Sequence, residues 1–414
     1  MNSFRRDSAT FTCDGIPIAT IVEKLGTPTY VYSAAEIESR FRLIDTAFGS
    51  HPHAIHYAMK ANSSLALIQL LHRLGSAVDA NSGGEIELAL RAGFVPQEII
   101  FTGVGKTTDE LKLAVQLGVK AINAESEGEL QRIAKTAKKQ GKIARVALRV
   151  NPDIDAKSHP HISTGLRSNK FGIGIHQIME VCRKVSTRDS LALVGLHVHV
   201  GSQILDLNPL KRATKMLVDL AEELRAMGIT LEHLDIGGGL GISYDGQDAP
   251  SASEYAEGVL EVTKNSGMSL ILEPGRAIVG PAGVLVTRVV DVKPQPGGRW
   301  FVVVDAGMTE LIRPALYDAY HRIEMLSAPF GPEVVCDIVG PVCETSDVVG
   351  LNRMMPLPEV GDLLVVRDTG AYGAAMSSNY NRRPMAPEVL VENGGWRVIR
   401  RRQRIEDILV CESQ

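Results

Sequence analysis

One lysine stands where an amine could act as a nucleophile. Lys60 lies in Y-A-M-K-A-N at 57–62, directly after an apolar run typical of a strand. Apolar neighbours desolvate an amine and lower its pKa, so more of it is the free nucleophile that forms a Schiff base with an aldehyde. The alternative is a partly buried structural lysine held in an ion pair.

Two histidines follow another apolar run. His197 and His199 begin the motif H-V-H-V-G-S-Q at 197–203. Alternate residues of a strand share a face, so both rings are expected to point the same way. Such a pair can bind a metal ion. A neutral imidazole can instead stack on a flat cofactor, with Gly201 and Ser202 close to an anion.

Two further motifs could bind an anion. The three glycines of D-I-G-G-G-L-G at 235–241 expose backbone N–H groups that can cradle a phosphate, or they form a flexible turn. In E-P-G-R at 273–276, Glu273 could hold a pyridine nitrogen protonated beside Arg276, or the two could pair on the surface. A lysine, a stacking ring, a phosphate cradle and a carboxylate are together what pyridoxal 5′-phosphate (PLP) requires.

Alternating strands and helices position these motifs. Eight short apolar runs are predicted strands: 54–59, 77–80, 99–102, 121–124, 144–150, 193–200, 231–236 and 269–272. Helical patterns that end at a glycine lie between them, as expected of helix C-termini: 65–74, 85–92, 109–117, 127–140 and 209–227. This alternation predicts an α/β (β/α)8 TIM-type barrel, with a doubly wound open sheet as the alternative. The four motifs follow strands, where such barrels carry their active sites.

The pattern changes after Gly280. Short β-type runs separated by glycine and proline predict an all-β, antiparallel C-terminal domain: 284–292, 300–304, 334–339, 363–367, 388–391 and 396–400. The strand-like piece at 29–32 is expected to join that sheet, because chain termini often lie close together. The predicted domains are therefore 33–280 for the barrel, and 1–32 plus 281–414 for the β-domain.

Composition excludes several classes of protein. The 414 residues are 44% hydrophobic and 22% charged, which excludes a disordered or fibrous chain. A net charge of -4 gives no footprint for nucleic acid, and the lack of an apolar run of about 18 residues argues against a membrane partner. Five scattered cysteines without a C-x-x-C pair suit a reducing compartment. The polar N-terminus lacks the apolar region of a secretory signal, so we expect a cytoplasmic enzyme.

The chain resembles the diaminopimelate decarboxylase family, within the alanine racemase-like (fold type III) group of PLP enzymes, from about residue 28 to 410. Beyond the motifs above, four stretches carry the resemblance: N-P-D-I-D-A-K-S-H-P-H-I-S-T-G at 151–165, D-A-G-M-T-E-L-I-R-P-A-L-Y-D-A-Y-H at 305–321, C-E-T-S-D at 343–347 and A-Y-G-A-A-M-S-S-N-Y-N at 371–381. The first two are specific for the diaminopimelate branch. One position departs from the group: Asn81 is polar where an apolar residue is more usual, and nothing in the sequence explains it.

The resemblance implies a role for each matched residue. Lys60 forms the Schiff base with PLP, His199 stacks on its ring, and Glu273 serves the pyridine nitrogen. The remaining implied cofactor contacts are Ser202, Gly239, Pro274, Gly275, Arg276 and Tyr372. The implied substrate contacts are Arg276, Arg313, Tyr317, Glu344 and Tyr372. No metal is implied.

The resemblance also implies a reaction, the decarboxylation of meso-2,6-diaminopimelate to L-lysine and CO2 as the last step of lysine biosynthesis. Cys343, reaching in from the partner subunit of a homodimer with shared sites, is the implied proton donor. A thiol can serve as a general acid, although a free cysteine is more commonly a buried structural residue. Arginine suits bidentate carboxylate binding, which fits Arg276 and Arg313.

Other activities fit the residues less well. A decarboxylase of ornithine or arginine would need an acidic group where the distal substrate carboxylate binds, and Arg313 argues against that. A relative that only binds partners would be expected to have lost Lys60 or Cys343, and the C-E-T-S-D segment disfavours an alanine racemase. The segment 157–170, with Lys157, His159, His161 and Lys170, is expected to cover the site.

Overall fold

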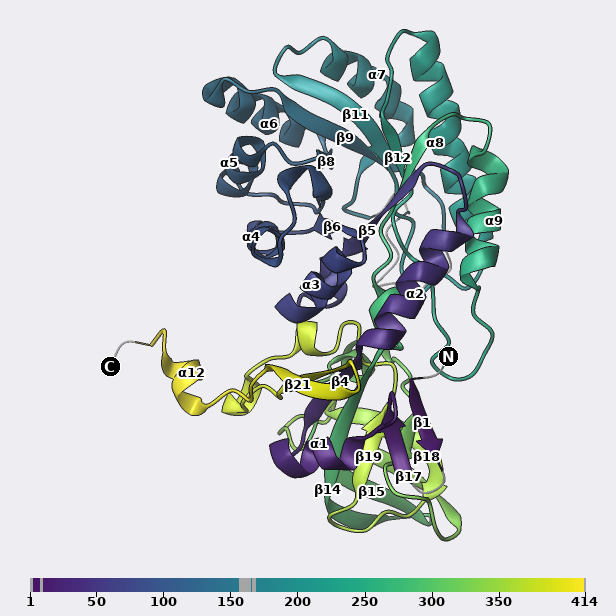
Figure 1. Ribbon diagram of the computed structural model, residues 1–414, viewed down its shortest axis with the longest axis vertical. Coiled ribbons are helices and arrows are strands. Elements are labelled where there is room, and N and C mark those ends of the chain that lie inside the picture. The colour runs from purple at the N-terminus through teal and green to yellow at the C-terminus, as the bar shows by residue number, and fades with distance from the viewer. Residues whose placement is uncertain (1–2, 8–9, 156–164, 166–168, 413–414) are drawn as a thin grey trace. The chain divides into compact units, whose positions relative to one another are not determined.

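The computed structural model describes residues 3–7, 10–155, 165 and 169–412 (Figure 1). Lys157, His159 and His161 of the expected covering segment lie outside the described residues. The chain divides into two compact units, one of Phe41–Ile242 and Asp248–Ala277, the other of Met1–Arg40, Ser243–Gln247 and Ile278–Gln414. Of the helices in the described part of the chain, none has the length and apolar character that a membrane span requires.

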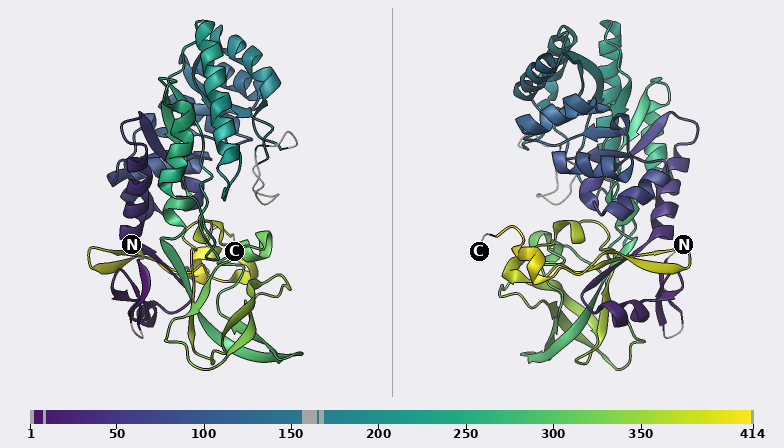
Figure 2. Two further views of the ribbon diagram at one scale, coloured as in Figure 1. Left: turned by 90° about the vertical axis from the view of Figure 1, so that its right-hand side faces the viewer. Right: turned by 60° about the vertical axis from the view of Figure 1, so that its left-hand side comes forward.

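Parallel strands close into a barrel in the first unit (Figures 1 and 2). Its eight strands are β5 (His53–Ala58), β6 (Ala77–Ala80), β7 (Ile99–Phe101), β8 (Ala121–Ala124), β9 (Ala144–Asn151), β11 (Leu191–His197), β12 (His233–Asp235) and β13 (Ser269–Leu272). The first and last of them, β5 and β13, pair in parallel, and β8 pairs with β9, so the ring is complete. The predicted barrel is confirmed and the open sheet is wrong. The short β10 (Ile173–Gly174) adds to β9.

Helices lie outside this ring (Figure 2). In the described residues they are α2 (Ala34–Ala47), α3 (Leu65–Arg73), α4 (Gly83–Ala92), α5 (Thr108–Leu117), α6 (Glu127–Gln140), α7 (Ile175–Ser186), α8 (Asn208–Ala226), α9 (Ala252–Thr263) and α10 (Arg276–Val279), with 3-10 turns at Met59–Ala61 and Pro96–Glu98. Serine or threonine side chains cap the starts of α4, α5, α6 and α9, and each accepts the N–H of a glutamate three residues on. Left-handed glycines end α4, α5 and α6, as predicted.

Helices α2, α7, α9 and α10 were not among those predicted, and α7 and α9 show what was overlooked. Helix α7 has a buried stripe at helical spacing, namely Ile178, Val181, Cys182 and Val185, but follows β10 rather than one of the eight predicted strands. Helix α9 begins at a capping box on Ser251. Both carry ordinary helix signals, which strand counting overlooked.

The second unit is built on one large sheet. Its strands are β4 (Thr29–Ser33), β14 (Gly283–Gln295), β15 (Arg299–Val304), β16 (Ile323–Met325), β17 (Glu333–Val339), β18 (Val348–Pro356), β19 (Leu363–Val366), β20 (Glu388–Glu392) and β21 (Gly395–Arg400). Strand β4 pairs with β14 and β20, which confirms that the N-terminal segment completes the sheet. Most pairs are antiparallel, while β4–β20 and β15–β17 are parallel.

Smaller elements complete this unit. They are β1 (Phe4–Asp7), β2 (Thr10–Cys13), β3 (Ile16–Pro17), α1 (Ile18–Leu25), α11 (Arg313–Tyr317) and α12 (Ile405–Leu409), with 3-10 turns at Ala374–Met376 and Tyr380–Arg382. Phe4, Phe11, Ile18 and Val22 pack with Val284 and Val389 in one buried cluster. Residues from both chain ends therefore share one hydrophobic core.

Two buried barrel histidines predict an acid-sensitive fold. Burial lowers the pKa of His56 to about 4 and that of His233 to about 3. An unfolded histidine has a pKa of about 6.5, so below that pH the unfolded chain takes up protons that the folded chain does not. The stability present above pH 6.5 is therefore lost as the pH falls toward 4.

We expect His56→Asn, which cannot titrate, to lose less stability than the wild type between pH 7 and pH 4.5. At about 1.4 kcal/mol per pKa unit, the difference is on the order of 3 kcal/mol. Denaturant unfolding across this pH range measures it, with His176→Asn, at an exposed position on α7, as control. Parallel pH curves for wild type and His56→Asn would contradict the expectation.

Candidate active site

Backbone hydrogen bonds join the loops that follow four barrel strands. The Ala58 N–H donates to the Pro274 carbonyl at 3.3 Å, and Glu273 N–H donates to the Gly237 carbonyl at 2.8 Å. Ile204 N–H donates to the Gly239 carbonyl, also at 2.8 Å. These bonds bring the ends of β5, β11, β12 and β13 together. With them they gather the predicted barrel residues Lys60, His199, Ser202, Gly239, Glu273, Pro274, Gly275 and Arg276 at one rim.

Lys60 lies just beyond β5, with its side chain 34% exposed and its Nζ 3.7 Å from Asp79 Oδ2. Burial and the nearby Glu273 charge raise the pKa of Asp79 to about 7, against the opposing pull of Lys60. Asn81 Nδ2 donates to Asp79 Oδ2 at 3.0 Å. Asn81, which nothing in the sequence explains, therefore stabilises the Asp79 carboxylate that pairs with Lys60. The ion pair and a chemical role for Lys60 are compatible here.

Three buried acid–base groups meet below this rim. The ligand atoms of His197, Asp235 and Glu273 lie within 4.8 Å of one another, and His197 Nε2 is 3.5 Å from Glu273 Oε2. Burial and the Glu273 charge raise the pKa of Asp235 well above its ordinary value. Burial alone would raise the pKa of Glu273 too, but attraction to His197 and Lys60 holds it below its ordinary value. Asp235 is therefore the neutral acid and Glu273 the carboxylate.

The Glu273 carboxylate is suited to a cationic ligand. Its side chain is buried, and among the described residues neither of its oxygens accepts a hydrogen bond. A buried, ionised oxygen without a donor is costly. A protonated ring nitrogen would supply that donor, so the residues present fit the pyridine end of PLP.

The two histidines differ in their surroundings. Strand β11 ends at His197 rather than at 200, so His199 lies just beyond the strand. His197 is fully buried, whereas His199 is half-buried. Burial, and then the positive charges of Lys60 and Arg149, put the pKa of His199 well below its ordinary value. Its ring is therefore neutral, which is compatible with stacking on a flat cofactor.

The glycine run after β12 is a close-packed cradle. A Cβ on Gly237 would lie 2.5 Å from the Val198 carbonyl oxygen, one on Gly239 would lie 2.5 Å from that of Gly201, and one on Gly238 would strike that of Glu273. The flexible-turn alternative is therefore wrong. Arg276 Nη2 donates to Ser202 Oγ at 2.9 Å. Glu273 and Arg276 are both buried, so the alternative of a surface pair is wrong as well.

The remaining predicted residues belong to the second unit. Arg313, which is buried, and Tyr317, which is half-buried, lie on α11. Tyr372 takes a left-handed backbone with φ 57°, which non-glycine residues rarely adopt outside functional sites and turns. The Cys343 N–H donates to Asn381 Oδ1 at 3.3 Å, and Tyr380 OH donates to Glu344 Oε1 at 2.6 Å.

Exposure separates the cysteines. Cys13, Cys182 and Cys336 are buried, while Cys343 and Cys411 are exposed. Burial raises the pKa of Cys182 to about 12 and that of Cys336 to about 11. The alternative of a buried structural cysteine is therefore wrong for Cys343, whose thiol faces solvent in this chain.

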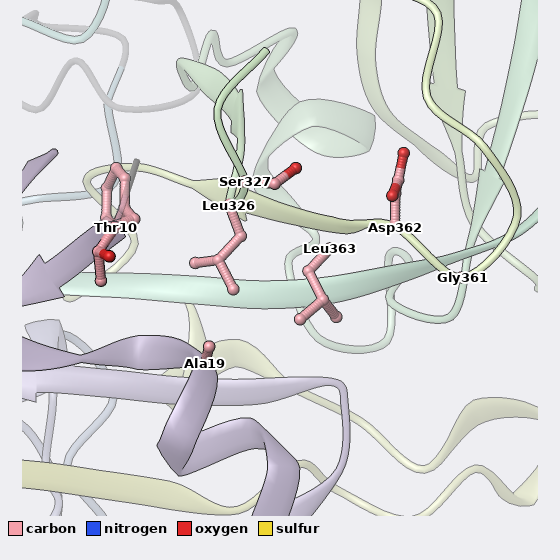
Figure 3. Close-up of a pocket in the computed structure, with 8 residues that line it drawn as sticks. Thr10, Ala19, Leu326, Ser327, Gly361, Asp362 and Leu363 are labelled. Carbon is pink, nitrogen blue, oxygen red and sulfur yellow. The ribbon is translucent and has the colours of Figure 1, made fainter. Parts of the chain in front are cut away.

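Sequence reasoning overlooked several residues around these positions. Asp79 and Asp235 each lie one residue before the end of a predicted strand, so a search of the last strand residues, besides those that follow a strand, could have found them. His321 contacts Arg313 and closes the quoted stretch at 305–321, while Tyr244 gives no local signal. A pocket of about 320 Å³ in the second unit, lined by Phe11, Leu326 and others, includes no predicted residue (Figure 3).

Comparison with known proteins defines the class. A family model described as "Pyridoxal-dependent decarboxylase, pyridoxal binding domain" matches residues 34–280, more than half of the chain. The chain therefore belongs to the pyridoxal-dependent decarboxylases, and its cofactor is PLP.

Individual relatives point to one kind of enzyme within this class. The chain is 46% identical over 403 residues to the diaminopimelate decarboxylase of Neisseria meningitidis serogroup A, covering 97% of this chain and 99% of the relative. It is 46% identical over 399 residues to that of Vibrio cholerae, covering 96% and 95%.

Solved structures that resemble this chain include enzymes of the same name. Diaminopimelate decarboxylase from Helicobacter pylori, complexed with L-lysine, matches with a TM-score of 0.92 at 40% identity, covering 95% of this chain and 99% of that one. The M. jannaschii enzyme with L-lysine matches with a TM-score of 0.94 at 35% identity, covering 100% and 98%. A lysine/ornithine decarboxylase from Vibrio vulnificus, at 23% identity, shares the fold alone.

The close packing of the cradle leads to a prediction about cofactor binding. Gly239→Ala is expected to weaken PLP binding by about tenfold or more, because the new methyl must displace the Gly201 carbonyl or Ile204. Fluorescence titration of cofactor-free protein with PLP measures this. Gly228→Ala is the matched control, since Gly228 also has a positive φ (79°) but open space around its Cβ position. Equal affinities of the two variants would contradict the cradle.

Proposed function

We propose that the protein decarboxylates meso-2,6-diaminopimelate to L-lysine and CO2, as the last step of lysine biosynthesis. The observation that carries the proposal is 46% identity, over nearly the whole chain, to relatives named diaminopimelate decarboxylase. L-lysine, the expected product, is bound in the similar structures from H. pylori and M. jannaschii.

The barrel residues would hold the cofactor. Lys60 would bind its aldehyde carbon covalently, Glu273 would accept a hydrogen bond from its ring nitrogen, and the neutral ring of His199 would cover its face. Gly237–Gly239 with Ser202, Gly275 and Arg276 would surround its phosphate. When bound, PLP supplies an electron sink for the electron pair released as CO2 departs.

Charge placement at this rim supports those roles. Asp235 carries the proton and Glu273 the negative charge, so Glu273 can keep a ring nitrogen protonated. Asp79 accepts a hydrogen bond from Asn81 and lies 3.7 Å from Lys60 Nζ. Its carboxylate would therefore favour the ammonium form of Lys60 until the lysine gives up its proton. Asp235, Asp79 and Lys60 are thus the described groups that can hold a proton at this rim.

The second-unit residues would hold the substrate. An arginine binds a carboxylate through two parallel hydrogen bonds, which suits Arg313 and Arg276 for a substrate with two carboxylates. Glu344 would pair with the distal ammonium, and Tyr317 and Tyr372 would line the site. The Cys343 thiol would then give its proton to the substrate carbon that has lost CO2, which completes L-lysine.

We further propose that Cys343 and Glu344 serve the active site of the partner subunit in a homodimer. The family resemblance of the C-E-T-S-D segment supports this proposal. The exposure of Cys343 is consistent with it, since a proton donor for another subunit must lie at the surface of its own chain.

Substrate choice tests the main proposal. Purified holoenzyme is expected to release L-lysine and CO2 in equal amounts from meso-diaminopimelate, and neither product amine nor CO2 from ornithine or arginine. Lys60→Ala should abolish turnover, while Lys112→Ala, at an exposed lysine paired with Asp109, should retain it. Release of CO2 from ornithine but not from diaminopimelate would refute the proposal.

Mixed dimers test the shared site. Lys60→Ala and Cys343→Ala subunits, each inactive alone, are unfolded together, refolded and assayed. Random pairing leaves one complete site in each mixed dimer, so about one quarter of wild-type activity should return. If each subunit used its own Cys343, every site would lack one residue and no activity would return.

A further inference from the structure

Arg313 is hydrogen-bonded to His321, and the contacts of the two ring nitrogens determine the tautomer of this histidine. His321 Nδ1 lies 2.8 Å from the Arg367 carbonyl oxygen, and His321 Nε2 lies 2.7 Å from Arg313 Nη1. A carbonyl oxygen only accepts and a guanidinium only donates. Nδ1 must therefore carry the hydrogen and Nε2 must be the bare acceptor. This is the neutral imidazole in a single tautomer.

The anchor of this histidine is the sheet of the second unit. Arg367 directly follows β19, and its N–H donates to the Arg322 carbonyl at 2.8 Å. Strand β16, two residues after His321, pairs with β19. His321 is fully buried. It therefore links the short helix α11, which carries Arg313, to a backbone that the sheet holds in place.

Tyr244 holds the same two residues from another direction. The Arg313 guanidinium lies over the Tyr244 ring, 4.9 Å from its centroid. The Tyr244 and His321 rings meet edge to face at 5.0 Å and 75°. A cation over an aromatic face is attracted without losing its charge. Both contacts orient the guanidinium, and neither brings a negative charge to it.

We propose that His321, together with Tyr244, is the positioning residue that makes Arg313 select a substrate with a second carboxylate. This inference rests on the proposed function. A carboxylate in place of the imidazole would orient Arg313 equally well, but it would also compete with an anionic substrate for the guanidinium. A neutral acceptor orients the arginine and adds no negative charge beside it.

The test compares two variants of nearly the same shape in the holoenzyme. His321→Asn keeps a neutral acceptor, whereas His321→Asp introduces a charged one. With meso-diaminopimelate, we expect KM to rise no more than about fivefold in His321→Asn, and at least about tenfold further in His321→Asp. The kcat should change less than about twofold in both, because a positioning residue for the distal carboxylate acts on binding.

Ligand binding separates this inference from the proposed function. Calorimetric titration should show that pimelate, with two carboxylates, loses affinity in the same order, and that hexanoate, with one, binds Asn and Asp variants alike. Equal KM and equal pimelate affinity in the two variants would overturn the role of His321. Failure of the wild type to act on diaminopimelate would overturn the proposed function, and the pimelate comparison would still test His321.

Two controls guard against a folding defect. His53→Asn removes a histidine that also contacts a backbone carbonyl at 2.8 Å, that of His51, and KM should stay unchanged. Tyr244→Leu leaves the buried imidazole in place and should raise KM about threefold with kcat unchanged, which is the scale of one cation–π contact. An unchanged KM in Tyr244→Leu would overturn the proposal even if neither His321 variant folds.

Discussion

The pairing of the first and last barrel strands, β5 with β13, is the constraint on which the site depends. These strands lie more than 200 residues apart in the chain, yet their register aligns Leu272 with Ile55. Because all the barrel strands are parallel, their C-terminal ends meet at one rim. The hydrogen bonds from Ala58 to Pro274 and from Glu273 to Gly237 extend that pairing into the loops. The closure of the ring is therefore what brings Lys60 and Glu273 to the same rim.

Each unit contains a buried charged side chain that lies beside a neutral one. One close neighbour of each buried charge is itself uncharged. In the barrel, Glu273 is ionised beside Asp235, which holds a proton. In the second unit, Arg313 lies against the neutral imidazole of His321. The buried charge is negative on Glu273 and positive on Arg313, which are the signs that their proposed roles require.

Much of the fold was predictable because its signals are local. The strands at 77–80, 121–124 and 269–272 and the helix at 127–140 match the structure residue for residue. They are short buried runs or capped, periodic segments. The end of β11 was predicted too late, since the apolar residues Val198 and Val200 continue the strand pattern into a loop. The parallel pair β4–β20 joins opposite ends of the chain and leaves no local trace.

The sequence by itself determined the chemistry that is available: a lysine, a glycine cradle and a carboxylate after the first, seventh and eighth predicted strands, because residue types and strand ends can be recognised locally. Only the tertiary structure decided how those groups are charged and oriented. Asn81 looked unexplained until Asp79 was seen to accept its hydrogen bond. The proton on Asp235 and the tautomer of His321 depend on burial and on partners far along the chain. Protonation is a property of the surroundings, and only the folded chain supplies those.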